Sequence, residues 1–396
     1  MKLRTRWSGL ATALALSVLV AGCSESKSTN NAGGGASTGP VKMGAVLDIT
    51  GAGASLGVTE RKSIELAVKQ LNDKGGVGGR QLQLITEDNQ STEDGAAKAI
   101  NKLVSQDQVD IVLGASRTGP SLAMRPIAES SKMPMISLAA SKAIIDGSQW
   151  VFKTAQNDAV VIAQMIDLAK QRGWKTIGLA RDASGFGEGV AEGMTDQGKS
   201  GGISVIRIEK FAPDATDFTA QMVNLRSANA DANVIWGIPP AAALAQRAYR
   251  QLGIASPVLQ SHGIGNQAFL DTAGASADGL LAPLGRINVA DQLPADNPQK
   301  KVLTDFIDNY RKAYGGEQPS AFAGYGYDAV NLAAEAIGKA GTNKQAVRDY
   351  LEGVKNHVGV SGVFTMSPQD HSGLTKDAVV MTTVANGKFT LMSKPG

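Results

Sequence analysis

Short apolar segments alternate with amphipathic helical segments along residues 41–396, and this alternation is the feature that most constrains the fold. The first cycle has an apolar run at Val41–Leu47, and then apolar residues recur at helical spacing from Ile64 to Leu71. Short apolar runs at 82–85, 109–113, 135–139, 177–180, 203–208, 234–238, 258–260 and 279–284 predict further strands. The helical periodicity between these runs predicts right-handed βαβ units, that is, parallel sheets covered by helices.

The pattern starts a second time after residues 150–154, which we interpret as a segment that crosses between two parts of the fold. A helix with apolar residues on one face from Ile162 to Ala169 follows, and then a second series of strands and helices. The last two strands form a hairpin at 378–392, with an Asn-Gly turn. The predicted fold class is α/β, with two lobes of similar construction and a chain that recrosses between them.

The first 40 residues have the composition of a targeting segment. Lys2, Arg4 and Arg6 precede an uninterrupted apolar run at 10–20, which is too short to span a bilayer but suits the core of a signal peptide. Residues 24–40 are rich in Ser, Gly, Asn and Thr and have almost nothing to bury. We therefore expect a flexible tether between the signal segment and the folded part of the chain.

The formal net charge of +3 comes from this same segment. The chain has 39 lysines and arginines against 36 aspartates and glutamates, and Lys2, Arg4 and Arg6 account for the difference. The remainder of the chain is neutral overall, so the basic pI does not point to a nucleic-acid partner.

The apolar run ends in Val20-Ala21-Gly22-Cys23, which resembles the lipobox of bacterial lipoproteins. The resemblance implies that residues 1–22 are a signal peptide that is removed, that Cys23 becomes the lipidated N-terminus, and that residues 23–40 are the tether. Cys23 is the only cysteine, and lipidation would use up a thiol that has no partner for a disulfide. A secretory signal followed by an incidental free cysteine is the alternative.

Residues 193–200 (GMTDQGKS) match the G-x-x-x-x-G-K-[ST] pattern of phosphate-binding loops. Such a loop needs a strand before it and a helix after it, whereas here a predicted helix precedes and a predicted strand follows. We therefore interpret the match as a coincidence and expect the end of a helix, with Gly198 as its cap.

The histidines give no indication of a catalytic or metal site. His262, His357 and His371 are the only three, they lie far apart in the sequence, and none belongs to an H-E-x-x-H motif or a His/Cys cluster. We expect no enzyme activity, no metal and no cofactor.

Three predicted strand ends combine small residues with hydroxyl groups, at residues 113–119, 137–141 and 51–57. Ligands of open α/β sheets bind at the carboxyl ends of the strands, where loops meet helix N-termini. Hydroxyl and free N–H groups at these positions suit a carboxylate or another anion. The alternative, that Thr118 and Ser141 do no more than cap helices, stays open.

Five motifs together carry a family resemblance: residues 72–80 (NDKGGVGGR), 135–141 (MISLAAS), 186–189 (FGEG), 273–280 (AGASADGL) and 325–329 (YGYDA). They resemble the leucine-binding-protein-like family, the type I periplasmic receptors of branched-chain amino-acid ABC transporters. The similarity covers residues 41–396 and implies two Rossmann-like lobes joined by three hinge crossings. The implied boundaries are 41–157 and 287–361 for lobe 1, and 158–286 and 362–396 for lobe 2.

The resemblance also implies a ligand site between the lobes. Thr118 and Ser141 fall where the family anchors the α-carboxylate of the ligand, and Ala139 falls where a backbone carbonyl accepts from the ammonium. Phe186 takes the place of a lobe 2 tyrosine over the ligand, and Phe322 matches an aromatic wall.

Some positions depart from the family pattern. His262 stands where many amino-acid-binding members place a glutamate that pairs with the ammonium, and Leu56 replaces an aromatic residue. A buried ammonium without its carboxylate is costly, by several kcal/mol. Asp158 in the hinge is an alternative source of negative charge. Gln90 and Arg117 stand in place of the two cysteines of some members, so that disulfide is absent.

The resemblance implies an extracytoplasmic substrate-binding lipoprotein that binds a branched-chain or other apolar amino acid and delivers it to an ABC permease. It would be anchored to the membrane by lipid on Cys23, at the periplasmic or extracellular face of the cell envelope, with no nucleic-acid partner. Because of His262, a receptor for a small non-amino carboxylate or an amide is an alternative. A ligand sensor for a signalling partner is another.

Overall fold

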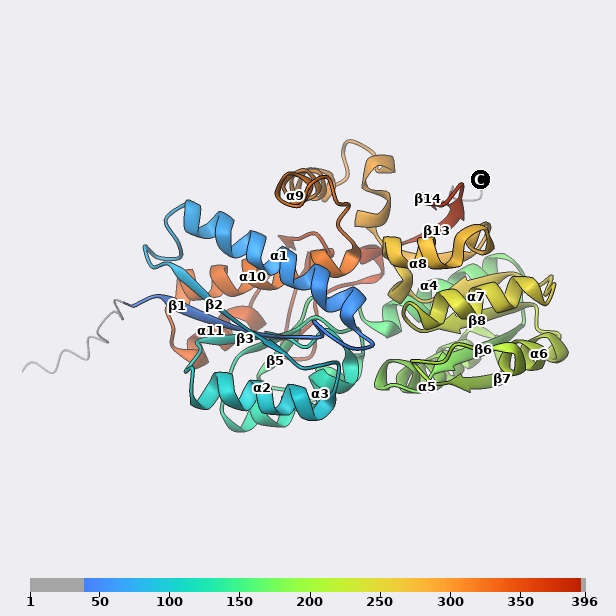
Figure 1. Ribbon diagram of the computed structural model, residues 1–396, viewed down its shortest axis with the longest axis horizontal. Coiled ribbons are helices and arrows are strands. Elements are labelled where there is room, and N and C mark those ends of the chain that lie inside the picture. The colour runs from blue at the N-terminus through green and yellow to red at the C-terminus, as the bar shows by residue number, and fades with distance from the viewer. Residues whose placement is uncertain (1–38, 393–396) are drawn as a thin grey trace, which may run out of the picture. The chain divides into compact units, whose positions relative to one another are not determined.

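The computed structural model describes residues 39–392. The predicted signal peptide, Cys23 and nearly all of the predicted tether lie outside the described residues. Residues 39–392 form two α/β lobes, each built around its own sheet (Figure 1). This confirms the predicted fold class.

The sheet of the first lobe has five parallel strands in the order β2-β1-β3-β4-β5. Helices α1 and α10 pack together on one face and α2 and α3 on the other (Figure 1). Coverage on both faces explains why the strands read as nearly continuous apolar runs. The strands are β1 (Val41–Leu47), β2 (Leu82–Asp88), β3 (Ile111–Gly114), β4 (Met135–Ser137) and β5 (Val151–Lys153), and the helices are α1 (Ala54–Asp73), α2 (Glu93–Ser105), α3 (Thr118–Ser130), α10 (Ala321–Ala340) and α11 (Lys344–Glu352).

The sheet of the second lobe has seven strands in the order β14-β13-β10-β9-β8-β6-β7. The five strands from β10 to β7 are parallel, and the hairpin β13–β14 adds an antiparallel edge. The strands are β6 (Thr176–Asp182), β7 (Ser204–Phe211), β8 (Ala232–Trp236), β9 (Val258–Gln260), β10 (Leu281–Gly285), β13 (Val379–Ala385) and β14 (Lys388–Leu391). The helices are α4 (Asp158–Gln171) and α5 (Gly185–Gly201), packed on each other, and α6 (Thr219–Ala228), α7 (Ala241–Gln251) and α8 (Gln267–Ala273).

The segments that cross between the sheets are tied together by side chains of the first crossing, which follows β5. Gln156 Nε2 donates to the carbonyl of Ser361 at 2.6 Å, and Gln156 Oε1 accepts from the Tyr325 hydroxyl at 2.7 Å. The Thr154 hydroxyl donates to the carbonyl of Tyr325 at 2.9 Å. These buried bonds join the crossing to α10 and to the turn between β11 (His357–Val358) and β12 (Val363–Phe364), two short strands that pair as a ribbon.

Helix α10 is buried along most of its length and approaches α1 closely. A side chain at Gly326 would place its Cβ 2.6 Å from Ser63 Oγ and 2.9 Å from the carbonyl oxygen of Glu60, so glycine is required at this crossing. The remaining long helix, α9 (Lys300–Ala313), is amphipathic and buries Leu303 and Phe306. Within residues 39–392, no helix combines the length and the hydrophobicity needed to cross a membrane.

The structure corrects three sequence-based expectations. Residues 151–153 form the fifth strand of the first sheet, so the crossing begins after them. Helix α5 runs to Gly201, and Gly202, with φ of 73°, is its left-handed cap in place of Gly198. The phosphate-loop match at 193–200 therefore lies inside a helix. Helices α8 and α11 were not predicted, because each is short and follows a loop rich in polar residues.

Candidate functional site

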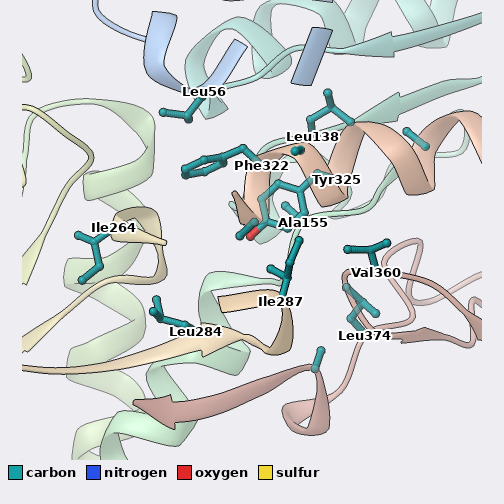
Figure 2. Packing of buried hydrophobic residues seen from close by; sticks show 14 of the residues in the cluster. Leu56, Leu138, Ala155, Ile264, Leu284, Ile287, Phe322, Tyr325, Val360 and Leu374 are labelled. Atoms are coloured by element: carbon teal, nitrogen blue, oxygen red, sulfur yellow. The ribbon is translucent and has the colours of Figure 1, made fainter. Parts of the chain in front are cut away.

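A cavity of about 210 Å³ lies between the two lobes at the carboxyl ends of their parallel strands. Figure 2 shows part of its apolar surroundings, with Leu56 and Phe322 from the first lobe facing the same space and Ile264 on the side of the second lobe. A larger open groove between α9 and the β13–β14 turn contains none of the predicted site residues. The cavity between the lobes is therefore the candidate ligand site.

Six of the seven predicted ligand-binding residues line this cavity: Leu56, Thr118, Ala139, Phe186, His262 and Phe322. They come from α1, α3, the loop after β4, α5, the loop after β9, and α10. Segments that are distant in the chain meet here because the strands of each sheet are parallel and end at the same edge.

Ser141 is not among the residues that line the cavity. Its hydroxyl accepts a hydrogen bond from the Ala143 N–H at 3.3 Å and caps a short 3₁₀ helix, Lys142–Ile144. Thr118 differs, because it is the first residue of α3 and the preceding cap residue, Arg117, makes no capping bond with its side chain. The capping interpretation therefore applies to Ser141 and not to Thr118.

The N-termini of α3 and α5 approach each other across the cavity from opposite lobes. A Cβ on Gly185 would lie 3.2 Å from Thr118 Cγ2 and 3.6 Å from the backbone nitrogen of Gly119, so the two helix ends are nearly in contact. The first N–H groups of a helix have no partner inside the helix, and its dipole favours negative charge there. The arrangement suits a small anion such as a carboxylate.

His262 forms an aromatic cluster with Phe186 and Trp236 in the wall of the second lobe. The ring centroids are separated by 5.2 Å for Phe186–Trp236, 5.6 Å for Phe186–His262 and 5.8 Å for Trp236–His262. Burial, together with the charge of Lys153, lowers the pKa of His262 to about 3, so the imidazole is neutral. Among residues 39–392, none offers a hydrogen-bond partner to its Nδ1.

Lys153 lies at the end of β5, behind the loop that carries Ala139. Its Nζ donates to the carbonyl of Ala140 and, at 2.7 Å, to Asn157 Oδ1. Burial lowers its pKa to about 7, against the attraction of Asp158 and two other aspartates. Asp158 itself does not line the cavity; its Oδ1 accepts from the backbone N–H groups of Lys142 and Ala159.

Several cavity residues were not predicted as ligand contacts, among them Ser116, Arg117, Asp182 and Tyr325. Ser116 and Arg117 lie within the predicted strand end 113–119, and Asp182 is the last residue of β6, so the rule that ligands bind at strand ends could have found them. Tyr325 offered no such signal, because it faces the cavity only through the packing of α10.

The charged groups of the cavity are largely held by neighbours. Arg117 donates from Nε to the buried Asp48 carboxylate and from Nη2 to the carbonyl of Ser91. Asp182 Oδ1 accepts from the Ser184 hydroxyl at 2.5 Å and from the Ser184 N–H at 3.0 Å. Burial raises the pKa of Asp182 despite these bonds and the charge of Arg117.

Residues 53–57 (GASLG) match the G-x-S-x-G pattern of serine nucleophiles, and they lie between a strand and a helix. Ser55 does not line the cavity, however, and its Oγ is buried without a hydrogen-bond partner in the described part of the chain. A serine needs an adjacent base to act as a nucleophile, so this motif carries no catalytic function. The described residues also contain no group of three or more His, Cys, Asp or Glu placed to hold a metal ion.

The sequence of this chain is similar to the sequences of known binding proteins. A sequence profile of the periplasmic binding protein family matches residues 40–388. The leucine-, isoleucine-, valine-, threonine- and alanine-binding protein of Pseudomonas aeruginosa is 28% identical over 306 residues, 76% of this chain and 79% of the relative. The Leu/Ile/Val-binding protein of Escherichia coli K12 is 27% identical over 262 residues, 65% of this chain and 70% of the relative.

Solved structures of ligand-binding receptors are also similar to this chain. An extracellular ligand-binding receptor from Rhodopseudomonas palustris HaA2 has a TM-score of 0.84 at 26% identity, covering 89% of this chain and 99% of its own. The branched-chain amino acid transporter substrate binding protein LivJ from Streptococcus pneumoniae, in complex with isoleucine, has a TM-score of 0.77 at 26% identity, covering 88% and 97%. The likeness extends over both lobes.

Proposed function

The chain belongs to the periplasmic binding protein family, and from this premise we propose that it is the substrate receptor of an ABC transporter. Members of this family bind solutes and are not enzymes. The observation that carries the proposal is the cavity of about 210 Å³, to which both lobes contribute an apolar wall and a few hydrogen-bond donors. Pockets for drug-sized ligands usually have volumes of roughly 300–1,000 Å³, so the volume here favours a smaller ligand.

We propose that the ligand carries a carboxylate at the N-terminus of α3. The Thr118 hydroxyl and the backbone N–H groups of Thr118 and Gly119 at the start of α3 supply donors there. The N–H of Phe186 at the start of α5 is already capped by the Ser184 hydroxyl. Donors of this kind replace the water that a carboxylate loses on burial. Leu56, Leu138, Phe186 and Phe322 would surround the remaining, apolar part of the ligand.

A branched-chain amino acid is the first candidate, because the relatives from P. aeruginosa and E. coli are named for binding leucine, isoleucine and valine. A small carboxylate without an ammonium is the second, and the state of His262 favours it. The neutral imidazole offers no negative charge to an ammonium, and the charge that perturbs it most is the cation of Lys153. An ammonium would therefore have to pair with one of the two acids that line the cavity, Glu93 or Asp182, because an unpaired buried ammonium is disfavoured by several kcal/mol.

Binding would proceed by closure of the lobes. We propose that the ligand first docks on the lobe formed by residues 41–157 and 287–361, and that the lobe formed by 158–286 and 362–396 then covers it with Phe186 and His262. The closeness of Gly185 to Thr118 supports a closed state in which the helix ends seal the cavity. A permease would recognise this closed shape, because only the closed state brings both lobe surfaces into one arrangement.

Thermal unfolding of the purified protein with leucine, isoleucine, valine and 4-methylpentanoate tests the ligand class. A ligand at about 100 times its Kd adds about 2.7 kcal/mol to the free energy of unfolding. 4-Methylpentanoate is leucine without its ammonium, so stabilisation by this compound and not by leucine assigns a non-amino carboxylate. Stabilisation by leucine alone assigns an amino acid. If none of the four stabilises the protein, the proposed ligand class is wrong.

We also propose that the receptor is held at the outer side of a membrane by lipid on Cys23, with residues 24–40 as the tether. The apolar run at 10–20 and the sequence before Cys23 support this proposal. Labelling of cells with radioactive palmitate should mark the wild-type protein and not Cys23→Ala. Equal label on both proteins, or none on the wild type, would rule out the anchor.

A further inference from the structure

Glu60 is a fully buried acid beneath the floor of the cavity. It lies on α1, one turn after Leu56, and its relative exposure is 0%. The side of α1 that carries it packs on α10, where Gly326 approaches its backbone carbonyl. No part of the proposed function described above uses this carboxyl group.

In the part of the chain that the structure describes, neither carboxyl oxygen of Glu60 has a hydrogen-bond partner. The polar group beside it is the Ser116 hydroxyl, which lines the cavity. Burial raises the pKa of Glu60 well above its usual value, Ser116 opposes this rise, and the negative charge of Asp48 adds to it. Burial therefore favours the protonated, neutral form of Glu60, which has a proton to donate.

Asp48 is the acid of this neighbouring pair that is bound to a cation. Its Oδ1 accepts from Asn89 Nδ2 at 2.7 Å, and its Oδ2 accepts from Arg117 Nε. Two carboxyl groups that share a buried site do not both ionise, and the one that holds the cation keeps the charge. The other titratable group facing Glu60 is Tyr325 on α10, whose hydroxyl already donates to Gln156 and whose pKa is raised by burial.

We propose that Glu60 is a positioning residue, which donates its proton to Ser116 Oγ and thereby turns the Ser116 O–H toward the ligand carboxylate. A serine hydroxyl has one donor and two acceptor sites. Ser116 Oγ already accepts from the Asp48 N–H at 3.1 Å. With Glu60 as its second donor, both acceptor sites are filled and the single O–H is left for the cavity.

Ionisation of Glu60 reverses this arrangement. A carboxylate accepts hydrogen bonds only, so it would take the Ser116 O–H for itself and place a negative charge under the anionic end of the ligand. Binding of a carboxylate is therefore linked to the proton on Glu60, and each favours the other by the same factor. This inference rests on the proposed carboxylate ligand and adds a residue that sets its pH dependence.

The first test needs no ligand and reads the proton directly. The infrared difference spectrum between wild type and Glu60→Gln at pH 7 should contain the band of a protonated carboxyl group. Glu65→Gln is the matched control, since Glu65 lies on the same helix with a side-chain exposure of 49%. A difference spectrum that shows ionised carboxylate at Glu60 would overturn the proposal.

The second test measures the Kd of 4-methylpentanoate and of leucine by calorimetry from pH 6 to pH 10. Above the pKa of Glu60, the wild-type affinity should fall by about tenfold per pH unit, the limit for one linked proton. Glu60→Gln offers a permanent donor of the same shape, so this fall should disappear. Ser116→Ala removes the hydroxyl but not the charge of ionised Glu60, so it should keep part of the fall. A fall in Glu60→Gln equal to that of the wild type would refute the coupling.

The two tests separate the failure of this inference from the failure of the proposed function. If neither probe binds the wild type at any pH, the carboxylate ligand is wrong, and the coupling to a ligand is refuted with it. The infrared band would then still report whether Glu60 holds its proton.

Discussion

Replacing His262 with glutamate should turn the cavity into a site that prefers an amino acid over the corresponding carboxylate. His262 has a relative exposure of 3%, and its imidazole is neutral because burial and Lys153 lower its pKa to about 3. A glutamate at this position would place a carboxylate in the wall of the cavity. An ammonium on the ligand would then gain a partner, whereas a ligand without one would gain nothing.

The size of the change follows from the burial of this position. Two unit charges about 4 Å apart attract by about 4 kcal/mol at the effective dielectric constant of about 20 that applies near protein sites. The hydration that glutamate loses in the wall reduces this gain, so we expect about 3 kcal/mol, roughly a hundredfold in Kd. The new carboxylate would raise the pKa of Lys153 above its wild-type value of about 7, so protonated Lys153 competes with the ligand ammonium for the new charge.

Calorimetry at pH 8 should compare leucine with 4-methylpentanoate in wild type, His262→Glu and the neutral control His262→Gln. The ratio of the two dissociation constants should shift by roughly a hundredfold toward leucine in His262→Glu and stay near the wild-type ratio in His262→Gln. A ratio that is the same in all three proteins would show that His262 does not face the ammonium position. A shift toward 4-methylpentanoate in His262→Glu would refute the electrostatic argument.

Three further outcomes test the geometry. Gly185→Val should hold the two lobes apart, because its side chain would press on Thr118, and overpacking of this kind costs about 1–3 kcal/mol. Calorimetry should therefore find weaker ligand binding, while the melting temperature of the free protein changes little. Thr118→Val should weaken the binding of a carboxylate ligand by about 1.5–3 kcal/mol. Ser141→Ala should change the Kd of this ligand much less, because Ser141 does not line the cavity. A larger effect at Ser141 than at Thr118 would contradict the assigned anchor. Because burial lowers the pKa of Lys153 to about 7, only the unfolded state binds its proton between pH 7 and about 10. The free energy of unfolding should therefore rise with pH in this window, by up to about 1.4 kcal/mol per unit relative to Lys153→Met, and equal slopes in denaturant titrations would exclude this pKa.

The site residues show where reasoning from strand ends works and where it stops. Thr118, Ala139 and Phe186 line the cavity because each directly follows a parallel strand or begins the next helix, which the sequence pattern reveals. Ser141 follows the same rule but faces the Ala143 N–H, because the chain turns into a 3₁₀ helix there. The choice between capping a helix and binding a ligand depends on a side-chain direction that residue spacing does not contain.

Glu60 gives a second case. It lies four residues before Ile64, on the side of α1 that the apolar periodicity predicts to be buried, so an acid there was a visible exception to the pattern. The sequence did not indicate which groups surround the carboxyl group of Glu60. Ser116 comes from the loop after β3, Asp48 from the end of β1 and Tyr325 from α10, and only the packed lobe brings the three around one carboxyl group.

The sequence by itself determined the α/β class, the two-lobe organisation and most of the strands, because hydrophobic periodicity is local and the burial of one face forces it. It also determined which loops carry small and hydroxyl residues to the strand ends. The tertiary structure alone decided the ionisation of groups in and around the cavity: the neutral imidazole of His262, the lowered pKa of Lys153 and the raised pKa of Glu60. The physical reason is that ionisation depends on lost water and on neighbouring charges, and both are set by contacts between segments far apart in the chain.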